Sequence, residues 1–236
     1  MNSRSLLIGV LVSAQCALAA LPVMSQTTHF DGVWQVVKYS GVMRTVNGAE
    51  PPLKPDALVT YHERMAAYRR GDHKFDPTMV SCASPGTPRT MLLPTPFEII
   101  DGPSQITFLF DWNHLFRTVP VGKPLSTVGY DTAVGTSEAK HDGADLEIRT
   151  DQINPATLLD AAGLPHSDKL VVQEVYHLTN NGNGMTLRLS FDDPDTYTSA
   201  WQTEVRFKRL PNYQIHEDIC LDRIAAGQPA VLEPKN

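Results

Sequence analysis

The chain has 236 residues, of which 42% are hydrophobic and 19% charged, and its formal net charge is −6. This length suits one domain that buries a sizeable core. The acidic balance, and the lack of a basic stretch interleaved with aromatic residues, argue against nucleic acid as a partner.

The first residues predict a secretory signal peptide over residues 1–25. Arg4 precedes a short apolar run at residues 6–12, and Ala17-Leu18-Ala19 has the small-x-small form of a cleavage site. The run is too short to cross a bilayer, which takes about 20 apolar residues. We therefore expect an exported protein, periplasmic or secreted, with no membrane span, in which residues 27–236 form a single domain.

Two cysteines remain once the leader and its Cys16 are removed. In an oxidising compartment such a pair usually forms a disulfide, so we expect Cys82 to pair with Cys220. Two free thiols are the alternative. An exported protein also has no pool of ATP or NAD at hand, and no phosphate-binding loop or dinucleotide fingerprint is present, so no cofactor is expected.

Taken in chain order, the pattern begins with a strand and a helix. Residues 30–37 predict the first strand, and Gly32-Val33-Trp34 has the G-x-W form that opens lipocalin-like barrels. After Pro51-Pro52-Leu53-Lys54-Pro55, four apolar residues recur at helical spacing, with Gly71 as the stop. They are Leu58, Tyr61, Met65 and Tyr68. Residues 76–96, with five prolines, predict an irregular crossing.

The rest of the chain reads as strands and turns. Asn180-Asn181-Gly182-Asn183-Gly184 predicts a hairpin turn. Many short, evenly spaced antiparallel strands predict an all-β fold, an antiparallel lipocalin-like barrel with one inserted α-helix. The expected strands cover residues 97–100, 106–119, 130–136, 145–150, 170–178, 185–191 and 201–209.

The segment 106–119 carries the main candidate for chemistry. Read as one strand, it places six residues on one apolar face, which we expect to be the interior. They are Ile106, Phe108, Phe110, Trp112, His114 and Phe116. An imidazole in such surroundings could exchange a proton as a neutral acid or base. The alternative is a core histidine bonded to a backbone carbonyl or a buried water.

Further polar and aromatic candidates lie on later segments. Glu174 and Tyr176 share one face of a predicted strand, and an inward Glu174 would offer a carboxylate beside the phenol. The alternative is an outward Glu174 paired with an arginine. His166, on a loop, has a structural role or a binding role, and Tyr197 and Trp201 line the core or the rim.

These residues support three hypotheses about function. The first is a cofactor-independent lyase (dehydratase) or isomerase acting on a small lipophilic alcohol or carbonyl compound by general acid–base catalysis. Its catalytic residues would be His114, Glu174 and Tyr176, and Phe110, Trp112, Phe116, His166, Tyr197 and Trp201 would bind the substrate. The second is a carrier or scavenger of a small hydrophobic molecule. The third is a structural envelope protein. No metal-ligand spacing is present, and the oligomeric state is left open.

A set of motifs between residues 76 and 220 resembles a family of secreted, largely uncharacterised bacterial proteins. They include Cys82-Ala83-Ser84-Pro85-Gly86-Thr87-Pro88-Arg89, Asp111-Trp112-Asn113-His114, Pro165-His166-Ser167-Asp168 and Asp193-Pro194-Asp195-Thr196-Tyr197-Thr198. This chain departs from the family at residues 128–136, where relatives carry a glycine-histidine segment and a tryptophan-rich hairpin. The resemblance implies export and no particular chemistry.

Overall fold

The computed structural model describes residues 29–123 and 129–232. The predicted signal peptide lies outside the described residues. Nine strands form a single sheet, in the order β4-β3-β2-β1-β9-β8-β7-β6-β5, and all paired neighbours are antiparallel. The strands are β1 (Gly32–Val36), β2 (Phe97–Asp101), β3 (Gln105–Phe110), β4 (Phe116–Pro120), β5 (Thr136–Asp142), β6 (Asp145–Asp151), β7 (Val171–Thr179), β8 (Gly184–Asp192) and β9 (Trp201–Arg209).

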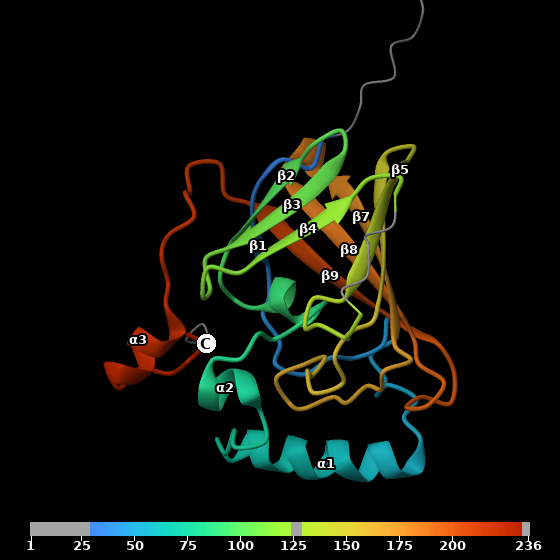
Figure 1. The fold of residues 1–236 in the computed structure, drawn as a ribbon, viewed down its shortest axis with the longest axis vertical. Helices are drawn as coiled ribbons and strands as arrows, with labels where there is room; N and C mark the ends of the chain where they lie inside the picture. Colours follow the sequence, from blue (N-terminus) through green and yellow to red (C-terminus); the bar gives the residue numbers. More distant parts are fainter. Residues whose placement is uncertain (1–28, 124–128, 233–236) are drawn as a thin grey trace, which may run out of the picture.

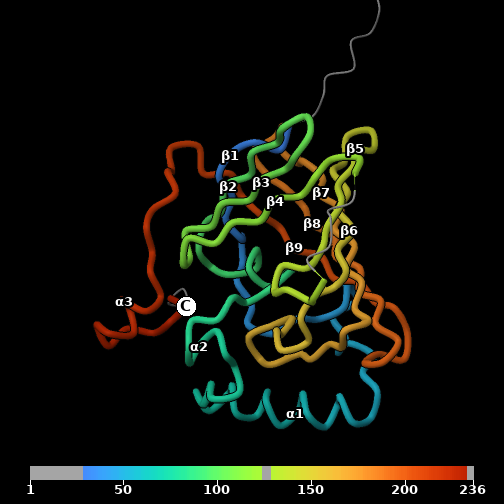
Figure 2. The backbone as a smooth tube through the Cα atoms, in the orientation of Figure 1, coloured from blue at the N-terminus to red at the C-terminus, as the bar shows by residue number. Residues whose placement is uncertain are grey.

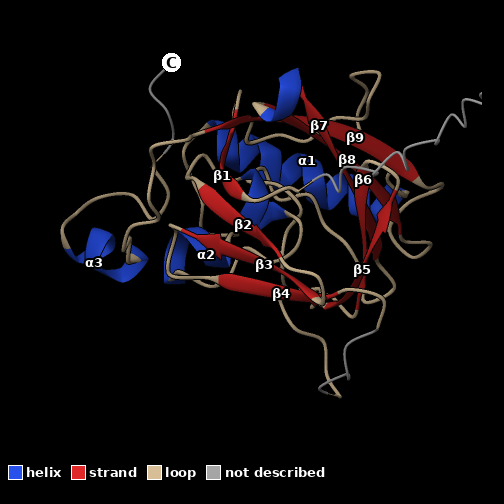
Figure 3. Ribbon diagram, turned by 90° about the horizontal axis from the view of Figure 1, so that it is seen from above, coloured by secondary structure: helices blue, strands red, loops and turns tan. Residues whose placement is uncertain are grey.

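The sheet curls into a nearly closed barrel (Figures 1 and 3). An odd number of alternating strands leaves the two edge strands, β4 and β5, running in the same direction. They meet just beyond β4, where Val121 and Ala139 form a parallel bridge and the Gly122 amide donates to the Ala139 carbonyl over 2.8 Å. The predicted all-β, antiparallel, lipocalin-like barrel with an inserted helix is confirmed.

Helix α1 (Pro55–Arg69) is the inserted helix, and it contains the four apolar residues from which it was predicted. Tyr61 and Met65 are buried one turn apart, and Gly71 follows the end of the helix with a φ of +76° that suits glycine. The helix lies across one end of the barrel (Figure 1). Figure 2 shows two long connections, about residues 37–54 and 152–170, between the helix and that end of the barrel.

The crossing predicted at residues 76–96 holds two short helices, α2 (Pro77–Ser81) and the 3₁₀ helix η1 (Arg89–Leu92). Asp76 caps α2, because its carboxylate accepts from the Thr78 amide over 3.0 Å. Cys82 follows α2 and is bonded to Cys220 at the start of α3 (Cys220–Ala225), which confirms the expected disulfide. The disulfide attaches the C-terminal arm, which runs beside the barrel (Figure 1).

The prediction of one long strand over residues 106–119 is wrong. The segment is a hairpin in which β3 and β4 are joined by a turn at residues 111–115, and Asn113 and His114 have left-handed φ values of 56° and 50°. The turn changes which positions face inward, so that Arg117 and Val119 are buried while Phe116 is exposed. The strand expected at residues 130–136 is also wrong, because β5 begins only at Thr136.

No helix among residues 29–123 and 129–232 is long and apolar enough to cross a membrane.

Candidate functional site

His114 does not lie inside the barrel, which corrects the predicted placement. Its side chain is 52% exposed at the tip of the β3–β4 turn, and its Nε2 lies 3.7 Å from the Glu217 carboxylate. Because the turn rather than a strand carries this residue, the structure brings His114 together with neither Glu174 nor Tyr176. The buried apolar surroundings on which its proposed catalytic role depended are therefore absent around this imidazole.

Glu174 and Tyr176 point into the barrel, side by side on β7. This is the inward alternative that the sequence offered for Glu174. The Tyr176 hydroxyl donates to Glu174 Oε2 over 2.6 Å. Arg117, from β4, donates to both oxygens of Glu174 over 2.7 and 3.0 Å. The inward alternative is therefore confirmed and the outward one is wrong, although the arginine partner expected for the outward side chain is present inside the barrel.

Hydroxyl groups complete this buried cluster. Arg117 also donates to Ser137 on β5 over 3.0 Å and to Thr150 on β6 over 2.7 Å. Burial by itself would lower the pKa of Arg117, but Glu174 and, to a smaller degree, Tyr176 together outweigh it and the pKa is raised. Burial, and then Glu174, raise the pKa of Tyr176 well above its ordinary value, so this phenol stays protonated.

The predicted substrate-binding residues are scattered over the molecule. Phe110 is buried in the barrel. Trp112 is buried in a separate cluster around the disulfide, where its indole donates to the Ala230 carbonyl over 2.8 Å. Phe116 is 66% exposed. These three aromatic residues therefore do not form one binding surface.

The other three predicted binding residues are buried near the α1 end of the barrel. His166 contacts the Thr157 hydroxyl and the Ser167 carbonyl, both over 2.9 Å, which matches the structural alternative for this loop histidine. Burial lowers its pKa. Tyr197 donates to the Pro165 carbonyl over 2.8 Å, and Trp201 stacks on a phenylalanine of β8 with ring centroids 4.3 Å apart.

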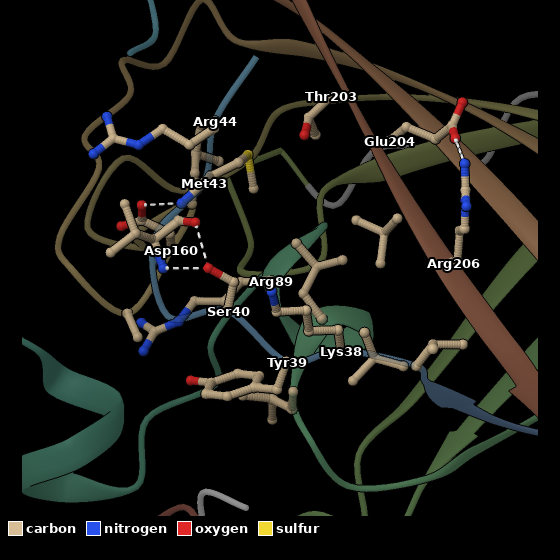
Figure 4. A pocket seen from close by; sticks show the side chains of 18 of the residues that line it. Lys38, Tyr39, Ser40, Met43, Arg44, Arg89, Asp160, Thr203, Glu204 and Arg206 are labelled. Atoms are coloured by element: carbon tan, nitrogen blue, oxygen red, sulfur yellow. Dashed lines mark hydrogen bonds and ion pairs between the residues drawn. The ribbon is translucent and has the colours of Figure 1, made fainter. Parts of the chain in front are cut away.

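A cavity lined by other residues lies at the same end of the barrel. Its volume is about 610 Å³. It arises where the chain leaves the sheet after β1. The Val37 amide still donates a hydrogen bond to the Arg206 carbonyl on β9, and the next such bond to β9 runs from the Val46 amide to the Gln202 carbonyl. Residues 38–45 swing away in between and leave a space beside β9 (Figure 4).

The walls of this cavity, which we call the end pocket, come from four segments: residues 36–46, η1 with Leu93, residues 159–161, and residues 203–206 of β9. Apolar side chains from all four contribute, among them Val36, Val42, Met43, Leu92, Leu159 and Val205. Val205 shows the effect on packing, because it is only half-buried while its neighbours on the same face of β9, Thr203 and Phe207, are buried.

Two buried ionisable side chains in these walls hold the surrounding loops in place. Asp160 accepts from the Met43 amide and the Tyr61 hydroxyl, both over 2.9 Å, and from the Leu164 amide over 2.8 Å. Burial raises the pKa of Asp160, while the amides of Met43 and Leu164 oppose the shift. Arg89 donates two hydrogen bonds, of 3.0 and 2.5 Å, to the fully buried Asp76. Both groups are satisfied by the chain itself.

None of the nine predicted catalytic and binding residues lines the end pocket. Sequence reasoning missed it because segments far apart in the chain form its walls. One signal was available: alternation along β9 places Thr203 and Val205 on the inner face, beside the predicted binding residue Trp201. In the part of the chain that the structure describes, no group of three His, Cys, Asp or Glu side chains could hold a metal ion.

No protein-family model and no curated protein sequence matches this chain. Solved structures of similar fold include the REP1-NXSQ fatty acid transporter, with 10% identity over 78% of this chain and 97% of that chain and a TM-score of 0.37. Another is the zebrafish ileal bile acid-binding protein complexed with cholic acid, with 11% identity, coverage of 77% and 98%, and a TM-score of 0.35. A third is the Schistosoma mansoni fatty acid binding protein in complex with arachidonic acid, with 12% identity, coverage of 77% and 96%, and a TM-score of 0.34. At these TM-scores the likeness concerns the barrel in outline.

Proposed function

We propose that this protein binds a small, mainly hydrophobic molecule in the end pocket and carries or sequesters it without changing it. The observation that carries the proposal is the pocket's size and lining. A volume of about 610 Å³ falls within the roughly 300–1,000 Å³ typical of small-molecule sites, which are also lined mainly by apolar side chains.

The positions of the polar groups favour binding over catalysis. A general acid or base must come within hydrogen-bond reach of the reacting atom. Glu174 and Tyr176 do not line the end pocket; they bond to each other and to Arg117 in the barrel interior. His114 lies at an exposed turn. The catalytic roles of these residues stay predictions, and the end pocket supports the carrier hypothesis.

We place this binding outside the cytoplasm, on the strength of the predicted signal peptide. The disulfide between Cys82 and Cys220 supports that placement, because such bonds persist mainly in oxidising compartments. The ligand would accordingly be a molecule that the cell meets, releases or stores beyond its inner membrane.

The proposal is tested by filling the pocket. Val205→Trp introduces an indole into the space beside β9, whereas the control Val175→Trp places the same side chain on the outward face of β7. The readout is the binding of Nile red, a neutral dye that fluoresces in apolar surroundings, with circular dichroism to verify the fold of each variant.

We expect the wild type and Val175→Trp to bind Nile red equally, and Val205→Trp to bind it at least about tenfold more weakly, because about 1.4 kcal/mol of lost contact is tenfold in affinity. Equal binding by both tryptophan variants, or no saturable binding by the wild type, would contradict the proposal. Mass spectrometry of molecules that co-purify with the wild type, but not with Val205→Trp, would identify the natural ligand.

A further inference from the structure

Most polar side chains around the end pocket are already paired within the chain. Asp160 accepts three hydrogen bonds and Arg89 pairs with Asp76, as described above. The two arginines nearer the surface also have acidic partners. The distances are 3.5 Å from Arg44 to Glu50 and 3.6 Å from Arg206 to Glu204. The polar groups of the lining that have no partner in the chain therefore indicate which groups a ligand would have to offer.

Thr203 is such a group on the inner wall. It is only 6% exposed, and it lies on the inward face of β9 as part of the pocket lining. Figure 4 shows its side chain directed toward the other lining residues. Its hydroxyl forms no hydrogen bond within residues 29–123 and 129–232, and its oxygen is open to the pocket rather than sealed inside the protein. An oxygen or nitrogen of a ligand in the pocket can therefore bond to this hydroxyl without displacing a partner within the protein.

Lys38 is the corresponding group at the rim. It is exposed and lines the pocket, and among the described residues it forms no ion pair, in contrast to the three arginines in the same lining. In Figure 4 it lies on the opposite side of the pocket from Thr203, with apolar side chains in between. A single surface lysine is weak evidence for an anion site, but this one lies across an apolar space from an unpaired hydroxyl in the pocket wall.

We infer that the ligand is an amphipathic organic acid with a second oxygen function. Its acidic group pairs with Lys38 at the rim, its apolar body lies against the side chains of the end pocket, and its hydroxyl or carbonyl oxygen bonds to Thr203. This inference rests on the proposed function and names the chemical class of its ligand.

The test compares simple acids that differ only in these two features. Displacement of Nile red is measured at low salt for linear carboxylic acids of eight, ten and twelve carbons, for their ω-hydroxy derivatives, and for alcohols of matching length. Each set is run on the wild type and on Thr203→Val, Thr203→Ser, Lys38→Gln and Lys208→Gln. Thr203→Ser retains the hydroxyl, and Lys208→Gln removes a charge from β9 outside the pocket lining.

For at least one chain length, we expect the wild type to bind the hydroxy acid about fivefold more tightly than the plain acid, as one net hydrogen bond allows. Thr203→Val removes this preference and Thr203→Ser retains it. The preference for acids over alcohols is smaller, about threefold, because the ammonium is exposed, and it disappears in Lys38→Gln but not in Lys208→Gln.

Equal binding of hydroxy acids and plain acids by the wild type at every length would overturn the role of Thr203. A preference for alcohols over acids, or a preference for acids that survives Lys38→Gln, would overturn the role of Lys38. Both results are compatible with the proposed function, which fails separately if Nile red binding is absent or is indifferent to Val205→Trp.

Discussion

The buried pair of Arg117 and Glu174 gives the most direct test of how the barrel is held together. Their side chains are only 4% and 0% exposed, and two hydrogen bonds of 2.7 and 3.0 Å join them. Removing one partner leaves a charge in the interior without its counter-charge, which typically costs about 3–5 kcal/mol. Domains of this kind have unfolding free energies of about 5–15 kcal/mol. Either single change would therefore remove a large part of the protein's unfolding free energy.

We expect Glu174→Gln and Arg117→Met each to lower the unfolding free energy by about 3–5 kcal/mol. The double variant should lose clearly less than the sum of the two single losses, because no isolated charge is then left behind. The assay is urea denaturation followed by circular dichroism, with the disulfide intact.

A matched pair at the surface serves as the control. Arg188 and Glu204 lie 3.9 Å apart on neighbouring strands with exposed or half-buried side chains, so the corresponding changes there should cost under about 1 kcal/mol. The reasoning is refuted if Glu174→Gln costs no more than the surface control, or if the losses of the two buried single variants simply add.

Two further predictions concern the disulfide and His166. The bond between Cys82 and Cys220 spans 138 positions of the sequence, so its reduction should lower the unfolding free energy by about 5 kcal/mol on chain-entropy grounds; an unchanged urea midpoint in reductant would contradict this. Burial lowers the pKa of His166 below its ordinary value of 6.5. The native state therefore binds fewer protons than the unfolded state, and this contribution to stability is complete above pH 6.5 and is lost as the pH falls below it. Between about pH 7.5 and about pH 5.5, the melting temperature of the wild type should fall more than that of His166→Gln; parallel falls would exclude His166 as a cause.

Elements with strong local signals were predictable from the sequence. The turn at Asn181 and Gly182 and the alternation in the strands on either side of it fix β7 and β8 almost to the residue, because glycine and asparagine adopt the left-handed conformations that tight turns need. The helix with Tyr61 and Met65 was equally clear, since its apolar spacing and its stop agree.

The β3–β4 hairpin was not predictable in the same way. The aromatic alternation of β3 continues through Trp112 to Phe116, so the pattern hides a turn that depends on left-handed backbone at Asn113 and His114. Trp112 is buried, but against the disulfide and the C-terminal arm rather than in the barrel. Distinguishing two buried environments requires knowing which distant segments pack there, and one strand's periodicity carries no such information.

The end pocket was beyond sequence reasoning for a similar reason. Its existence depends on residues 38–45 leaving the sheet and being held away from it by Asp160, more than a hundred positions further along the chain. The inward positions of Thr203 and Val205 could be read from the alternation along β9, but the space in front of them could not.

The odd number of strands has a consequence for how the barrel stays shut. The junction between β4 and β5 cannot continue the antiparallel ladder, and the bridge at Val121 and Ala139 lies at its edge. Arg117 reaches over this junction from β4 to Ser137 on β5 and onward to β6 and β7. One guanidinium thus connects four strands across the β4–β5 junction, the one place among them where backbone pairing is sparse. These hydrogen bonds join the two edges of the sheet inside the barrel, at the position where the backbone ladder is interrupted.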